Sequence, residues 1–403
     1  EASHLPEGGT SAAATAAATT LSIATSAAQD YGGAKSPAAA ASTPEACCSA
    51  LLQEGSWTEH GVFEWSDRAK TLCAYGAIDG EHAWSLLAGL RVWFAGNSVS
   101  RRLLYSVVDL LGQGRRQRQD EEYVSKYGAE DMYDESDHGL SHTYFKVALT
   151  RGGERMPPQT TCAAIKDRHG EFTDIREGEI RKHPKLLFCE PEDRPSVPAD
   201  GVELQHSYVD SDATLDMLRL WAKSSREDFA KHIGAGADVI LFAFPWHGAK
   251  DATEYSPPSL EAVTELAQLA PVIARRMLEE RGRKVTMLWL SLVEHAVKNG
   301  GEEAHARLSG DRLAQVERKH ASERAVMDEY VETSLPLVAQ AGLVPVLVSN
   351  TTLEGLEAGV LQHQAVQHFH DAGRRFLAQA LLNRVQLALR AAAAQPQTPA
   401  QAC

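Results

Sequence analysis

Four apolar segments of strand length recur along the chain, and each is followed by a stretch with apolar residues at helical spacing. The segments are RVWFAG at 91–96, ADVILFAF at 237–244, KVTMLWLSL at 284–292 and GLVPVLVS at 342–349. The longest helical pattern follows the last of them, over 371–392. Strands that are apolar throughout are typical of parallel sheets buried on both faces. The pattern therefore predicts an α/β fold, a mainly parallel sheet flanked by helices on both faces.

The two ends of the chain lack this pattern. Residues 1–46 are rich in Ala, Ser and Thr and show no apolar periodicity, which predicts a low-complexity stalk or linker. Residues 393–403 form a second, shorter tail for which we expect disorder. The folded domain is expected to span 47–392. Within it, 123–209 is less regular, and its stretches HTYFKVALT and KLLFCE are interpreted as extra strands or as an insertion over the active face.

Composition and charge narrow the classes of protein. Of 403 residues, 43% are hydrophobic and 23% are charged, which is enough material for one large core or two modest ones. The chain carries 54 acidic against 40 basic side chains, a formal charge of -14. Proteins bind nucleic acids through basic side chains that neutralise the phosphates, so this excess of acidic residues argues against a nucleic-acid partner. No segment approaches the ~20 apolar residues of a membrane span, so no membrane span is predicted in this chain.

Polar residues gather where the predicted strands end and the next helices begin. In open parallel sheets, ligands bind at this carboxyl edge. The edge residues are Gly96, Asn97 and Ser98 after the first strand, Trp246 and His247 after the second, His295 after the third, and Asn350, His363, His368, His370 and Asp371 after the fourth.

Ser98 admits two interpretations. Serine is among the best N-cap residues, and a turn from a strand into a helix favours one. Alternatively, Ser98 is a nucleophile at a helix N-terminus, where free N–H groups and the positive end of the helix dipole favour an oxyanion.

Three blocks of the sequence resemble a known family. LRVWFAGNSVSRRLLYSVVDLL at 90–111 is similar to the opening block of the trichome birefringence-like and PC-esterase branch of the SGNH (GDSL-like) hydrolases. GADVILFAFPWHG at 236–248 and QHFHDAGRRFLAQALLN at 367–383 resemble its second and closing blocks. The stretch before the first block, from GSWTEHG at 55–61 onward, is similar to the family's lead-in. The resemblance covers roughly 47–392 and implies an SGNH/flavodoxin-like three-layer sandwich.

The resemblance also implies roles for individual residues. Ser98 matches the nucleophile, Gly96, Asn97 and Ser98 form the oxyanion or turn segment, and His368 matches the general base that activates the serine. Arg101 stands where the family pattern has an arginine. The implied function is an esterase or O-acetyltransferase that moves an acyl group, usually acetyl, onto or off a glycan or polysaccharide through an acyl-serine. The implied partners are a carbohydrate or another acylated small molecule and an acyl donor, and no cofactor is expected.

The chain departs from the family pattern at several positions. The Asn that lines the oxyanion hole in the family falls on Ala243, and the Asp three residues before the base falls on Ala365. Asn97 replaces an Asp, and Pro245 replaces a glycine. Losing the group that orients the histidine typically costs a triad on the order of 10^4 in turnover. These departures support an alternative, a catalytically degenerate, glycan-binding pseudoenzyme of the same fold, and leave open whether the chain is an enzyme.

Several other edge residues are candidates for lining the site. They are Arg101, Trp246, His247, His295, His363, His370 and Asp371. His363 or Asp371 can orient the base in place of the absent acid, and His247 can act at the oxyanion. Trp246 is interpreted either as a sugar-stacking platform or as a core aromatic. The histidines have no Cys or carboxylate at ligand spacing, so no metal site is predicted.

A sequon, the cysteines and the stalk together indicate a secretory compartment. NTT at Asn350 is an N-glycosylation sequon that we expect in a loop after a strand. Six cysteines allow disulfides in an oxidising compartment, and one bridge is expected among Cys73, Cys162 and Cys189. We therefore expect a glycoprotein of the Golgi lumen or a secreted one, with any signal peptide or anchor upstream of Glu1.

Overall fold

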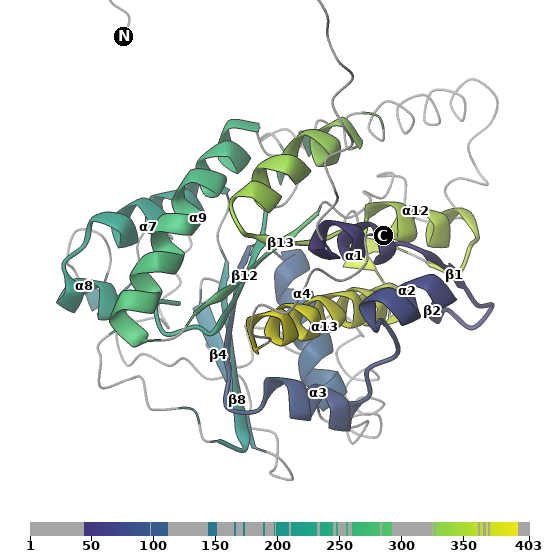
Figure 1. Ribbon diagram of the computed structural model, residues 1–403, viewed down its shortest axis with the longest axis horizontal. Coiled ribbons are helices and arrows are strands. Elements are labelled where there is room, and N and C mark those ends of the chain that lie inside the picture. The colour runs from purple at the N-terminus through teal and green to yellow at the C-terminus, as the bar shows by residue number, and fades with distance from the viewer. Residues whose placement is uncertain are drawn as a thin grey trace, which may run out of the picture. The chain divides into compact units, whose positions relative to one another are not determined.

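A computed structural model describes most of the predicted domain (Figure 1). The described residues are 44–96, 98–111, 144–150, 165–166, 172–173, 188–189, 197, 199–208, 211–231, 234–244, 247–248, 255–256, 260–282, 284–291, 325, 328–361, 363–365, 368–369 and 371–393. For some of these the backbone alone is described, among them Ser98, Tyr208, His247, His363, Ala365, His368 and Asp371.

A six-stranded sheet forms the centre, in the order β13-β12-β9-β3-β8-β4. Its strands are β3 (Arg91–Gly96), β4 (Tyr144–Thr150), β8 (Gly201–Tyr208), β9 (Val239–Ala243), β12 (Thr286–Leu290) and β13 (Val344–Val346). Five of them run parallel, and β4 pairs antiparallel with β8. The parallel strands follow the flavodoxin-like order, in which the first strand lies between the second and the third. The predicted mainly parallel α/β sheet is confirmed.

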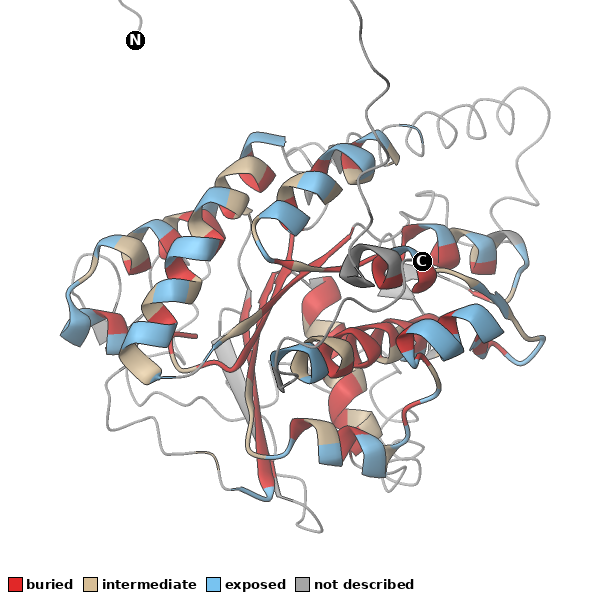
Figure 2. Cartoon of the chain, viewed as in Figure 1, coloured by how far each residue is buried: buried red, intermediate tan, exposed pale blue. Residues whose placement is uncertain are grey.

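Helices cover both faces of this sheet and give it three layers (Figure 1). One face carries α1 (Pro44–Leu51), α2 (Asp67–Cys73), α3 (Gly80–Leu87), α4 (Ser98–Leu111), α12 (Ser349–Glu357) and α13 (Asp371–Ala393). The other face carries α7 (Ser211–Lys223), α8 (Arg226–Lys231), α9 (Leu260–Arg281) and a helix described over 328–340. Figure 2 shows the buried residues on the strands and on the sides of the helices that meet them. Within the described residues, no helix combines the length and the apolar character needed to cross a membrane.

Strands β3 and β9 show why continuous apolar runs became central strands. All five residues of β9 are buried, as are five of the six residues of β3. Trp93 of β3 packs 5.3 Å, between ring centroids, from Trp221 of α7, whereas Phe94 belongs to the core on the α4 face. Successive residues of one strand therefore supply two different cores, which requires apolar side chains at every position.

The irregular segment of the sequence adds strands. HTYFKVALT contains β4, and KLLFCE contains β7 (Phe188–Cys189), which pairs with β5 (Ile165–Lys166) in a small sheet with β6 (Phe172–Thr173). Of the two alternatives for these stretches, the structure shows that both contain strand residues, and whether the segment is an insertion over the active face lies outside the described residues. The sequence analysis missed β8, because polar residues alternate with its apolar ones. Glu203 of β8 is nevertheless buried, because Arg91 of β3 forms an ion pair with it.

Two amides of α13 bind a stretch of extended backbone. Gln379 accepts a hydrogen bond from the N–H of Ile78 at 2.6 Å and donates one to its carbonyl at 2.7 Å. Asn383 pairs in the same way with Gly76, at 3.1 and 2.9 Å. The amides satisfy backbone groups that have no strand beside them, and so fix the chain between α2 and α3 against α13.

The fully buried Arg384 fixes the other side of α13. Its guanidinium donates hydrogen bonds to the carbonyl of Pro345 at 2.9 Å, to the Tyr75 hydroxyl at 2.8 Å and to the Ser49 hydroxyl at 2.8 Å. Burial raises the pKa of Tyr75, and the adjacent Arg384 guanidinium acts in the opposite direction. These bonds tie α13 to β13 and to α1, so the helix has a defined position on the sheet.

A disulfide joins α1 to α2. Cys48 and Cys73 are bonded, with their Cα atoms 5.6 Å apart. The bridge expected among Cys73, Cys162 and Cys189 does not include Cys73, because α1 folds back onto α2 and brings Cys48 to it. Cys162 lies outside the described residues, so a bridge between Cys162 and Cys189 stays a prediction. The chain turns back through the hairpin of β1 (Gly55–Trp57) and β2 (Phe63–Trp65).

Candidate functional site

The carboxyl end of β3 is the topological switch point of the sheet. Strand β8, the next parallel strand along the chain, lies on one side of β3, and β9 lies on the other. In open α/β sheets ligands bind at such a point. Helix α4 begins here at Ser98, two residues beyond Gly96, the last residue of β3. The sequence analysis placed the candidate nucleophile at this edge, and the backbone confirms that placement.

Gly96 makes the turn into α4 tight. A Cβ atom at this position would lie 2.6 Å from the carbonyl oxygen of Ala243 and 2.8 Å from the Ser100 hydroxyl. Both distances are shorter than van der Waals contact, so only glycine fits between β9 and the first turn of α4. Asn97 lies outside the described residues. The side chain of Ser98 does as well, and its hydrogen bonds therefore stay a prediction.

A buried serine and histidine lie directly beneath this turn. The Ser100 Oγ atom is 3.0 Å from Nε2 of His206, and both residues are fully buried. Ser100 is in the first turn of α4 and His206 is in β8, so the pair links the helix to the strand beside β3. The sequence analysis missed this pair. A histidine within the mixed pattern GVELQHSY was the available signal, but the two residues are 106 positions apart.

Ala243 ends β9 beside Gly96 and is almost completely buried. Its methyl group belongs to the core on the α4 face, and it offers no hydrogen-bond donor to an oxyanion. Pro245 and Trp246, which follow shortly after, lie outside the described residues. The structure therefore gives no side-chain donor at the position where the resembling family has an Asn.

His368 lies in a hairpin directly before α13. β14 (His363–Ala365) pairs with β15 (His368–Phe369), and the register places Ala365 opposite His368. The hairpin strand β15 contacts α13, and α13 packs against α4. The hairpin and the helix that begins at Ser98 therefore flank the same helix. The distance between the Ser98 and His368 side chains lies outside the described structure, and their pairing stays a prediction.

The remaining candidates are placed only in part. Arg101 is half-buried in the first turn of α4, and His247 lies in β10 (His247–Gly248), which pairs with β11 (Tyr255–Ser256). The residues that fall wholly outside the described structure are Trp246, His295 and His370, and the side chains outside it are those of His247, His363 and Asp371. Among the described residues, no three His, Cys, Asp or Glu side chains gather as metal ligands.

The sequon is placed in a helix. Asn350 is exposed in the first turn of α12, and its N–H donates a hydrogen bond to the Gln53 side chain at 2.9 Å. Thr352 is fully buried, and its hydroxyl donates to the Ser349 carbonyl at 2.8 Å. The expectation of a loop is therefore wrong, because α12 starts immediately after β13 and includes the sequon.

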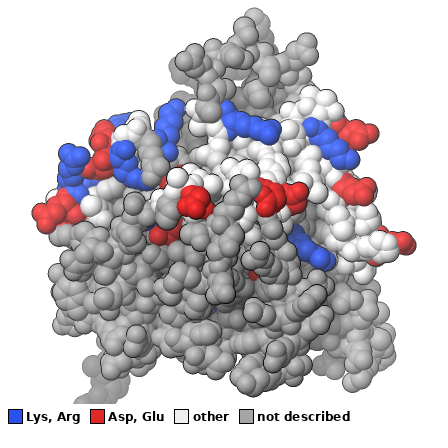
Figure 3. Space-filling model, turned by 90° about the horizontal axis from the view of Figure 1, so that it is seen from below, with Lys and Arg blue, Asp and Glu red and all other residues white. Residues whose placement is uncertain are grey.

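Charges of both signs are interspersed on the described part of the surface. In the view of Figure 3, Lys and Arg side chains stand beside Asp and Glu side chains. One such group on the α7 and α9 surface is Arg219, which pairs with Asp216 at 2.6 Å and with Glu265 at 2.5 Å. Ion pairs exposed in this way contribute little to stability.

No family model, curated protein or solved structure matches this chain. The family resemblance therefore depends on the sequence blocks alone.

Proposed function

We propose that this chain is a serine-dependent acyl esterase or O-acetyltransferase that acts on a glycan or polysaccharide through an acyl-Ser98 intermediate. The place of Ser98 carries the proposal. It is the first residue of a 14-residue helix at the carboxyl end of β3, the strand at the topological switch point. A helix N-terminus at this point favours the negative charge that develops in acyl transfer.

In the proposed reaction, Ser98 Oγ attacks the acyl carbonyl carbon while His368 accepts the serine proton. N–H groups in the first turn of α4 stabilise the tetrahedral oxyanion. When the intermediate collapses, His368 returns the proton to the leaving alcohol or other leaving group. Water or a glycan hydroxyl then attacks the acyl-serine, with His368 again as base, which completes hydrolysis or transfer.

The buried pair of Ser100 and His206 supports this role for α4. Because the pair links the first turn of the helix to β8, the N–H groups of that turn are held in place before a substrate binds. Groups held in advance stabilise an oxyanion better than groups that must reorganise. Neither residue is exposed, so we assign both as positioning residues.

A second function is favoured by one observation. Ala243 is buried at the edge of the proposed oxyanion hole and carries no donor. Loss of one such donor typically costs about 10^2 to 10^3 in turnover. A protein of this fold that binds glycans without catalysis would have the same backbone and the same alanine.

Acylation by p-nitrophenyl acetate, followed by mass spectrometry of the intact protein and its peptides, distinguishes the two functions. The esterase proposal expects a single acetyl group on Ser98, which Ser98→Ala abolishes and His368→Ala strongly reduces. Ser85→Ala is the matched control, because Ser85 is an exposed helical serine on α3. Equal acetylation of the wild type and Ser98→Ala would favour the binding protein.

Ala365→Asp tests the absent acid. Residues directly opposite in an antiparallel pair share one face of the ladder, and Ala365 is opposite His368. A carboxylate there should orient the base and raise turnover, at most by about 10^4 if nothing else in the chain orients it. An unchanged rate in a variant that is still acylated at Ser98 would show that another group already fills this role.

We propose that the protein acts in the Golgi lumen or after secretion. The buried Cys48–Cys73 disulfide and the exposed Asn350 support this location, because disulfides persist in oxidising compartments. The acceptor or acylated substrate would then be a glycan or polysaccharide of the secretory route.

A further inference from the structure

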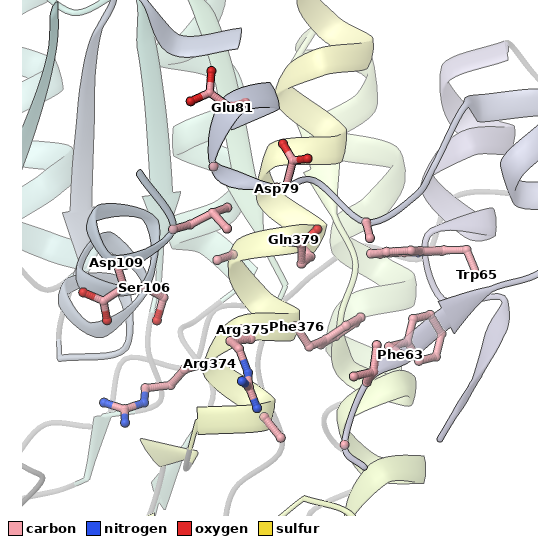
Figure 4. Close-up of a pocket in the computed structure, with 17 residues that line it drawn as sticks. Phe63, Trp65, Asp79, Glu81, Ser106, Asp109, Arg374, Arg375, Phe376 and Gln379 are labelled. Atoms are coloured by element: carbon pink, nitrogen blue, oxygen red, sulfur yellow. The ribbon is translucent and has the colours of Figure 1, made fainter. Parts of the chain in front are cut away.

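A cavity of about 690 Å³ lies between α3, α4, α13 and the β1–β2 hairpin (Figure 4). It lies on the α4 face of the sheet, and its lining includes Ser106, two turns beyond Ser98 along α4. Its volume falls in the range of pockets that bind small molecules. The reaction proposed above uses none of its lining residues.

One wall of the cavity is aromatic. Phe63 is 5.5 Å from Trp65 and 5.1 Å from Phe376 between ring centroids, and Trp65 uses its Nε1 to donate to the Leu52 carbonyl at 3.0 Å. These three residues are 7%, 3% and 3% exposed. This is too little free ring surface for a sugar to stack on a ring face. An aliphatic chain would reach only the edges of these rings, and the more accessible apolar lining comes from Val62, which is 51% exposed, and from the half-buried Leu110.

Charged residues occupy opposite ends of the cavity. Figure 4 shows Asp79 and Glu81 at one end and Arg374 and Arg375 at the other, with a third carboxylate, Asp109 of α4, on the wall between them. Asp79 caps α3, where its carboxylate accepts a hydrogen bond from the His82 N–H at 2.8 Å. Arg375 is exposed and forms no ion pair or hydrogen bond with any described residue. The arginine end of the cavity therefore has a cation that is available to a ligand.

Arg375 lies close to the N-terminus of α13. Arg375 is the fifth residue of a 23-residue helix, and the cavity also reaches Ala372 in the first turn. The N-terminus of a helix carries a partial positive charge. This effect is confined to the first turn, which begins at Asp371, and Asp109 also lines the cavity, so the guanidinium of Arg375 is the main attraction for an anion at this end.

We propose that the cavity binds a medium-chain fatty acid, with its aliphatic chain along Val62, Leu110 and the ring edges of the aromatic wall and its carboxylate paired with Arg375. Guanidinium and carboxylate form charge-assisted, often bidentate hydrogen bonds. Each methylene group moved out of water adds to the affinity. This binding is independent of the proposed esterase reaction, because neither Ser98 nor His368 takes part in it.

Displacement of cis-parinaric acid, a fluorescent fatty acid, tests the proposal on the full chain. Decanoate should displace the probe from one site per chain. Acetate, which has the head group without the chain, should not displace it, and decanol, which has the chain without the charge, should do so at least about tenfold more weakly. Failure of decanoate to bind when it is titrated directly by isothermal titration calorimetry, or equal affinity for decanol and decanoate, would overturn the assignment.

Variants separate this site from nonspecific adsorption. Arg375→Gln should lower the affinity for decanoate about tenfold or more and leave the affinity for decanol unchanged. Val62 lines the cavity and is 51% exposed, so the fold should tolerate Val62→Asp. This variant should lower the affinity for both decanoate and decanol. Arg390→Gln, an exposed arginine near the end of the same helix, is the control and should change neither. Binding that Arg375→Gln and Val62→Asp leave unaltered would disprove the site. Ser98→Ala should bind decanoate like the wild type, whatever its esterase activity.

Discussion

The Ser100 hydroxyl lies 3.0 Å from Nε2 of His206, with both residues fully buried where α4 leaves the end of β3. A buried polar atom that loses its partner retains the cost of its own desolvation. The pair therefore makes the start of α4 depend on a residue of β8.

Ser100→Ala should destabilise the protein by about 1–3 kcal/mol, because it leaves the fully buried His206 ring without this hydrogen bond. Urea denaturation followed by circular dichroism measures the change. Ser106→Ala, in the same helix, is the control, because Ser106 is only half-buried and its hydroxyl bonds to the backbone of its own helix. Equal stability of the two variants would contradict the importance of the buried pair. If the pair positions α4 for catalysis, Ser100→Ala should also lower the rate of Ser98 acetylation.

Gly96→Ala should destabilise the protein by about 1–3 kcal/mol or more, as overpacking does, because the added methyl group would lie 2.6 Å from a backbone oxygen of β9. Thermal denaturation measures the effect. Gly76→Ala is the matched control, since its Cβ would meet no atom within 4 Å. A Gly96→Ala protein as stable as Gly76→Ala would show that the β3–α4 turn has room to move.

Replacing Cys48 and Cys73 together by alanine should cost about 3 kcal/mol, because the disulfide closes a loop with a sequence separation of 25. Both residues are buried, so the loss of two sulfur atoms from the core adds to this cost. The wild type under reducing conditions should show a similar loss in urea denaturation. Unchanged stability in the double variant would mean that α1 is held by other contacts, with Arg384 and Ser49 the first candidates.

Tyr330→Phe should leave stability at neutral pH unchanged or slightly higher. Burial raises the pKa of Tyr330, and the nearby Ser334 hydroxyl offsets only part of this effect. Neither hydroxyl has a hydrogen bond of good geometry within the described part of the chain, so little is lost with the oxygen.

The same substitution should reduce the loss of stability at alkaline pH. The folded pKa of Tyr330 is raised above the unfolded value of about 10, so its contribution is complete below about pH 10 and is lost as the pH rises further. Urea denaturation at pH 8 and pH 10.5 should show a smaller decrease for Tyr330→Phe than for the wild type. Equal decreases in the free energy of unfolding would mean that another group causes the alkaline loss of stability, and Tyr75 would be the next residue to replace.

Expression in a eukaryotic secretory host should attach an N-glycan to Asn350, whose side chain is exposed. Glycosidase treatment should lower the mass of the wild type, and Asn350→Gln should lack that difference. A wild-type mass that glycosidase does not change would count against a secretory location, but not against the fold.

Local sequence determined the central elements of this protein. β3, β9 and β12 are apolar at almost every position. All the side chains of such a strand are buried only when helices cover both faces of the sheet. The turn at Gly96 and the helix that begins at Ser98 were also predictable, because glycine permits the close approach of β9 and serine favours a helix start. These features depend on residues that are neighbours in the chain.

Tertiary structure decided which polar residues meet. Glu203 lies on the polar face of β8 with Gln205 and Ser207, whereas His206 lies on the opposite face, which it shares with the apolar Val202 and Leu204. Both are buried, and their partners are Arg91 and Ser100. Those partners are 112 and 106 positions away, so their proximity depends on the strand order and register of the whole sheet. The Cys48–Cys73 pairing depends in the same way on the packing of α1 against α2. The order of apolar and polar residues within a segment indicates which of its side chains must be buried. Which distant residue a buried polar side chain contacts is decided only when the sheet and its helices pack together.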